Sequence, residues 1–132
     1  MPILPNQLVV AVDFDDTIAS GFHKDALTLL PHCKEVLSRL YGKGFRFILW
    51  TCRSDDTLEQ AKEFLKEQDM FHLFDAINDQ HPEARERYDF TYSPKVWADV
   101  YIDDRHIGYH VEWLLIEQHL LLELEAVQTL PV

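Results

Sequence analysis

Hydrophobic residues along this chain alternate between unbroken runs and segments with helical spacing. Leu8 to Val12 are consecutively apolar and rich in β-branched side chains, which is typical of a strand buried on both faces. Phe45 to Trp50, Leu73 to Ile77 and Ala98 to Ile102 are three further strand candidates, mostly apolar, farther along the chain. The hydrophobic pattern therefore predicts four strands.

Helical patterns separate these runs. One begins at Pro31 and ends at Gly42 or Gly44, and a second follows Asp55 or Asp56, either of which could cap it. A third covers about His110 to Val127. Strands that alternate with helices predict a parallel sheet with right-handed crossovers and helices on both faces. We therefore expect an α/β fold, a three-layer Rossmann-like sandwich around a parallel sheet of four or more strands.

Two stretches lack either pattern and are expected to be loops, Ser20 to Lys24 and the longer Gln80 to Ser93. A long loop in a compact domain is often functional, but this one is too short to form a domain of its own. With 132 residues, the chain is expected to be a single domain, residues 1–132.

Charge and composition narrow the expected partners and location. A formal net charge of −11 disfavours nucleic acid, because nonspecific affinity for polynucleotides comes from cationic side chains. The chain has no basic-then-apolar leader and no apolar run of roughly 20 residues, so we expect a cytoplasmic protein without a membrane span. Cys33 and Cys52 lie in unrelated contexts, which disfavours a disulfide. The leucines from Leu114 to Leu124 are expected to be mostly core, and part of them could form a homo-oligomer contact.

Polar residues gather where the predicted strands end. Asp13, Asp15 and Asp16 follow the first strand, Thr51 follows the second, and the pair Asp103-Asp104 follows the last. Parallel strands present their carboxyl ends at one edge of a sheet, so these side chains should converge there. Like charges packed together are costly unless a cation shares them, and the cluster therefore predicts a divalent-metal site. The alternative interpretation is an ordinary solvated acidic turn.

Four short motifs follow one another along the chain: Asp13-x-Asp15-x-Thr17, the strand Phe45 to Thr51, Lys95, and Tyr101-Ile102-Asp103-Asp104. In this order they resemble motifs I to IV of the haloacid dehalogenase (HAD) superfamily. The resemblance is to the phosphatase and phosphomutase branch, because dehalogenase members lack a carboxylate at the position of Asp15. The gaps between the motifs are short, so the chain looks like a small capless member without the family's cap domain. No clear fifth strand follows the last motif.

The resemblance implies a role for each motif residue. Asp13 would attack phosphorus and form an aspartyl-phosphate, while Asp15 would serve as general acid and then as general base. Mg²⁺ would be held by Asp13, the main-chain carbonyl of Asp15 and Asp103, with Asp104 as a direct or water-mediated ligand. The candidates for contact with the substrate phosphoryl group are Thr17, Thr51, Arg53 and Lys95, of which Thr51 and Lys95 are also assigned to catalysis.

The role of Arg53 stays open at this point. It could contact the substrate, pin the acidic cluster, or form a purely structural salt bridge. Cys52 has no histidine nearby in the sequence and is rejected as a nucleophile.

The implied function is a Mg²⁺-dependent phosphatase acting on a phosphate monoester, which is either a small molecule or an exposed phosphate on a larger one. A phospho-receiver signalling domain is an alternative, because it too uses an aspartate cluster, a threonine and a lysine on a doubly wound sheet. Motif order argues against it, since Lys95 precedes the last aspartate pair. A third possibility is an inactive module that binds phosphate or metal.

Overall fold

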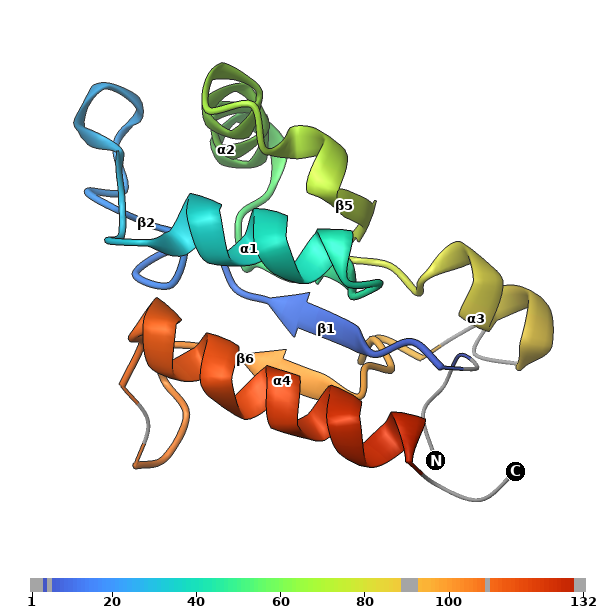
Figure 1. The fold of residues 1–132 in the computed structure, drawn as a ribbon. Helices are drawn as coiled ribbons and strands as arrows, with labels where there is room; N and C mark the ends of the chain where they lie inside the picture. The colour runs from blue at the N-terminus through green and yellow to red at the C-terminus, as the bar shows by residue number, and fades with distance from the viewer. Residues whose placement is uncertain (1–3, 5, 89–92, 109, 130–132) are drawn as a thin grey trace.

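At the centre of the molecule lies a parallel sheet whose strands run in the order β5-β4-β1-β6 (Figure 1). The computed structural model describes residues 4, 6–88, 93–108 and 110–129. The strands of the sheet are β1 (Val9–Val12), β4 (Arg46–Leu49), β5 (Phe74–Ile77) and β6 (Val100–Ile102). β1 pairs with β4 on one side and with β6 on the other, and all of its residues are buried. The predicted α/β fold with a four-stranded parallel sheet is confirmed.

Three long helices cover one face of this sheet. They are α1 (Cys33–Gly42), α2 (Asp55–Glu67) and α4 (Trp113–Gln128), and their buried residues form one cluster with Val10 and Val12 of β1. Figure 1 shows α1 and α4 side by side in front of the sheet. Arg39 of α1 donates to both carboxylate oxygens of Glu117 of α4, at 2.8 and 3.1 Å, and so joins the two helices.

The opposite face has a thinner cover. Val9 and Ala11 of β1 point to this side and pack in a second cluster with Ala84 of the short helix α3 (Pro82–Arg87) and with Val96 and Ala98. The chain steps from β1 to β4 to β5 in one direction and then returns past β1 to β6. Right-handed connections therefore place α1 and α2 on one face and the segment between β5 and β6 on the other.

Helix α3 corrects the expectation of an irregular stretch from Gln80 to Ser93, of which residues 89–92 lie outside the described residues. Pro82 occupies the start of the helix, where a missing N–H costs nothing. The His81 ring caps the helix by accepting from the N–H of Glu83 at 3.2 Å, and its other nitrogen lies 2.8 Å from the Asp75 carboxylate. Because this cap depends on a side chain of β5, the local pattern did not reveal the helix.

A small hairpin lies between β1 and α1, where only a loop from Ser20 to Lys24 was expected. It pairs β2 (Ala19–Ser20) with β3 (Thr28–Leu29), and the 3-10 helix η1 (Lys24–Ala26) lies between them. Gly21 at the turn has a φ of 108°, and a Cβ there would collide with the Ala26 carbonyl, so the turn requires glycine. We call residues 21–27 the hairpin loop.

The remaining features are the start of α2, a short helix before β5, the two cysteines, and the elements that the described residues do not contain. Ser54 is the N-cap of α2, so the prediction of Asp55 or Asp56 in that role was wrong; both lie in the first turn instead. The 3-10 helix η2 (Phe71–Leu73) precedes β5. Both cysteines are free thiols, as expected. Within the described ranges there is no inserted domain and no fifth strand in the main sheet. No helix among the described residues combines the length and apolar character that a membrane crossing requires.

Candidate metal centre

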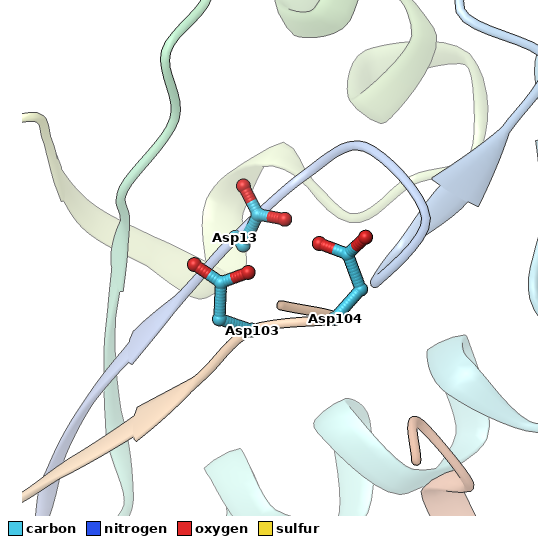
Figure 2. Close-up of side chains that lie close together, drawn as sticks. All are labelled: Asp13, Asp103 and Asp104. Carbon is cyan, nitrogen blue, oxygen red and sulfur yellow. The ribbon is translucent and has the colours of Figure 1, made fainter. Parts of the chain in front are cut away.

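Three carboxylates meet at the carboxyl end of the sheet, as predicted for the strand ends. Asp13 directly follows β1, and Asp103 and Asp104 directly follow β6. One carboxylate oxygen from each lies within 4.8 Å of the others. Figure 2 shows the three carboxyl groups around one small space. The main-chain N–H of Asp13 donates to the Ile102 carbonyl at 2.9 Å, so the pairing of β1 with β6 continues up to this group, which we call the acidic triad.

Thr17 connects the two halves of the acidic triad. Its buried hydroxyl donates to Asp13 Oδ2 at 3.1 Å and accepts from the main-chain N–H of Asp104, also at 3.1 Å. The indole N–H of Trp113, the first residue of α4, donates to the Thr17 carbonyl at 2.8 Å. Trp113 was not among the predicted site residues, because nothing local in the sequence indicates a bond that spans 96 positions.

The acidic triad has no cationic partner among the residues that the structure describes. Among the described residues, no lysine, arginine or histidine forms an ion pair with Asp13, Asp103 or Asp104. Burial, a hydrogen bond with Asp104 and the charge of Asp103 raise the pKa of Asp13 to about 7, although bonds from Thr17 and from the N–H of Phe14 oppose the rise. Three oxygen donors without a counter-charge could hold a metal ion, and such ligands suit hard cations.

Asp15 does not join the acidic triad with its side chain. Its two carboxylate oxygens accept from Arg53 instead, Oδ2 from Nε at 2.9 Å and Oδ1 from Nη2 at 2.8 Å. The Arg53 side chain is only 2% exposed, and 32% of the Asp15 side chain is exposed. We call these two residues the Arg53–Asp15 pair; of the interpretations left open for Arg53, the structure shows a contact with the acidic loop.

Among the described residues, Thr51 forms hydrogen bonds with Arg53 and Asn78 rather than with the acidic triad. Its hydroxyl accepts from the main-chain N–H of Arg53 at 3.1 Å, and its own N–H donates to Asn78 Oδ1 at 2.8 Å. Asn78 follows β5 as Thr51 follows β4, so the position of a polar residue directly after a strand was the signal that could have included it.

Lys95 is exposed, and its ammonium lies 5.1 Å from the centre of the Tyr101 ring. Within the part of the chain that the structure describes, it forms no ion pair with the acidic triad. Its catalytic role stays a prediction, as do the roles of Thr17 and Thr51 in binding a phosphoryl group.

Comparison with known proteins identifies a similar solved structure. A conserved protein from Bacteroides thetaiotaomicron shares 30% sequence identity with this chain and superposes on it with a TM-score of 0.74. The match covers 89% of this chain and 92% of the Bacteroides protein. No protein-family model matches the sequence, and neither does any curated protein.

Proposed function

This chain belongs to the same family as the conserved Bacteroides thetaiotaomicron protein, and we propose that it is a Mg²⁺-dependent phosphatase of the HAD type. It hydrolyses a phosphate monoester through an aspartyl-phosphate on Asp13. The observation that carries this proposal is the acidic triad, in which carboxylates from two neighbouring strand ends lie within 4.8 Å and form no ion pair with a cation of the described residues. An enzyme that brings an anionic phosphoryl group to a carboxylate needs such a place for positive charge.

The residues present fit the metal. Asp13, Asp103 and Asp104 would supply hard oxygen ligands, and the resemblance to HAD phosphatases adds the main-chain carbonyl of Asp15. Bound there, Mg²⁺ offsets the repulsion between carboxylate and phosphoryl group and polarises the phosphoryl oxygens.

The chain's own residues carry the two chemical steps. A carboxylate oxygen of Asp13 forms a bond to phosphorus while the ester P–O bond breaks, and the departing oxygen takes a proton from Asp15. Water then attacks phosphorus, the P–O bond to Asp13 breaks, and Asp15 accepts the proton of the water. The products are an alcohol, inorganic phosphate and the restored Asp13 carboxylate. Thr51 and Lys95 hold phosphoryl oxygens, which for Lys95 requires that its ammonium leave the ring of Tyr101.

The proposed substrates include small phosphate monoesters and exposed phosphates on larger molecules.

Three further expectations stay predictions: that the protein does not bind nucleic acid, that it is cytoplasmic, and that it self-associates through α4. Leu114, Leu115 and Leu122 of that helix are exposed, which is the feature on which self-association would depend.

The test is hydrolysis of p-nitrophenyl phosphate by the purified protein with and without Mg²⁺. We expect turnover that requires Mg²⁺, is removed by EDTA, and is lost in Asp13→Asn. Turnover that persists in EDTA would contradict the metal site, and wild-type turnover in the Asp13 variant would contradict the nucleophile. A panel of phosphorylated metabolites would then identify the substrate class.

The position of Lys95, whose ammonium lies over the Tyr101 ring, favours a second candidate, a module that binds metal and phosphate without turnover. In that case Mg²⁺ binds and raises the melting temperature, but no phosphate is released. A phospho-receiver differs from both, because its aspartyl-phosphate, formed from acetyl phosphate, would last for hours rather than seconds.

A further inference from the structure

Arg53 is a buried cation whose side chain is held at the edge of the candidate site. We propose that Arg53 is a positioning residue that fixes Asp15 as the proton acceptor for breakdown of the aspartyl-phosphate. This inference rests on the proposed function and deepens it, because it assigns Arg53 to one of the two chemical steps. It makes Arg53 neither a ligand of the substrate nor a purely structural cation.

The bonds of Arg53 leave little freedom to the guanidinium. Besides its two bonds to Asp15, Nη1 donates to the Thr57 carbonyl at 3.0 Å and Nη2 donates to the Phe22 carbonyl at 2.6 Å. All but one of its N–H groups are therefore used. A substrate phosphate could form two bonds to Arg53 only by displacing one of these acceptors, and the side chain is almost without exposed surface.

Two aromatic rings further restrict the guanidinium. Its central carbon lies 5.0 Å from the centre of the Phe14 ring and 4.5 Å from that of Phe22. Phe14 belongs to the loop after β1, Phe22 to the hairpin loop and Thr57 to α2. The planar fork is thus held by three separate segments, and a lysine could not reproduce the two parallel bonds to Asp15.

The geometry favours one of the two steps. Both oxygens of Asp15 accept from Arg53, so in this arrangement the side chain presents carboxylate lone pairs rather than a proton. Because 32% of the side chain is exposed, water can reach it. In the second step, the water oxygen bonds to phosphorus, the P–O bond to Asp13 breaks, and the proton of the water passes to Asp15. Loss of Arg53 should therefore slow this step more than the first.

Acid-quench kinetics with a ³²P-labelled aryl phosphate test the inference, since they measure covalent phosphoenzyme and released phosphate separately. In Arg53→Gln, we expect phosphoenzyme to form and accumulate while steady-state turnover falls about 10-fold or more. Arg53→Lys keeps the charge but not the fork, and it should show the same pattern to a lesser degree. Arg39→Gln removes the similar two-bond contact with Glu117 far from the site and should accumulate none.

Two results would overturn the positioning role of Arg53. One is that Arg53→Gln lowers the rate of phosphoenzyme formation and the steady-state turnover by the same factor. The other is that Arg53→Gln behaves like Arg39→Gln in both measurements. Thermal unfolding shows whether each variant is folded. If Arg53→Gln is unfolded, the kinetics of Arg53→Lys test the positioning role instead. Failure of the proposed function looks different, because the wild-type protein itself would then show neither phosphoenzyme nor Mg²⁺-dependent turnover.

Discussion

The acidic triad and the Arg53–Asp15 pair lie at the same edge of the sheet but treat negative charge in opposite ways. Asp13, Asp103 and Asp104 crowd together without an ion pair from the described residues. Asp15, two residues after Asp13, has a buried arginine of its own. A folded chain keeps an unbalanced acidic cluster at a cost in stability. The contrast teaches that one carboxylate at this edge is paired with a buried arginine, whereas the acidic triad is arranged so that it could hold a metal ion.

The largest expected effect is the loss of phosphatase turnover when Asp13, the proposed nucleophile of the acidic triad, is replaced. Asp13→Asn removes the attacking oxygen and a metal ligand at once, so phosphatase turnover should fall by about 1,000-fold or more. The measurement is release of p-nitrophenol at saturating Mg²⁺. Asp16→Asn is the matched control, because Asp16 is exposed, lies in the same loop and differs from its amide only in charge. Equal losses in the two variants would mean that the acidity of the loop, rather than the Asp13 carboxylate, matters.

The next largest effect is on Mg²⁺ affinity, which should depend on the acidic triad but not on the Arg53–Asp15 pair. Asp104→Asn should weaken Mg²⁺ binding by at least about 10-fold, because it removes an oxygen donor of the triad. Asp15→Asn should leave Mg²⁺ binding almost unchanged, since its side chain contacts Arg53 and its main-chain carbonyl is retained. Isothermal titration of each variant with Mg²⁺ measures both. If Asp15→Asn weakened binding as much as Asp104→Asn, the division between triad and pair would be wrong.

A smaller effect concerns pH and the metal-free protein. The folded-state pKa of Asp13, about 7, lies above its ordinary value of 3.8, so the folded form binds a proton that the unfolded form releases. The stability that Asp13 contributes is therefore full below about pH 4 and lost as pH rises through about 7. The difference in melting temperature between wild type and Asp13→Asn, measured at several pH values, isolates this contribution of Asp13 to stability. In EDTA, we expect wild type to weaken relative to the variant as pH rises, and Mg²⁺ to reverse the trend above pH 7.

The smallest effect concerns an arginine–carboxylate contact elsewhere. Arg39→Gln breaks two bonds to Glu117, but the Arg39 side chain is about half exposed, and solvent-exposed ion pairs contribute little. We expect unchanged turnover and at most a slight fall in the melting temperature, seen by calorimetry in low salt. Arg53→Gln, by contrast, leaves Asp15 without its buried partner and should lower the melting temperature more. Similar falls would show that burial of the arginine does not distinguish the two pairs.

The fold and the acidic triad were accessible from the sequence because their signals are local. Leu8 to Val12 form a run that suits only a buried strand, and the parallel arrangement then brings Asp13 and Asp103 to one edge. Helix α3 was missed because it has only six residues, four of them charged, and its cap depends on His81 and Asp75. The cap of α2 was misplaced by one or two residues, since serine and aspartate are almost equally good caps.

By itself, then, the sequence determined which segments are strands and which carboxylates stand at their ends, because hydrophobic period and strand polarity are properties of neighbouring residues. Only the tertiary structure decided which carboxylate would be neutralised. Arg53 bonds to Asp15, 38 positions away, and to the Phe22 carbonyl, 31 positions away. Such a contact depends on where the hairpin loop and α2 pack, and packing of distant segments leaves no periodic signal in the chain.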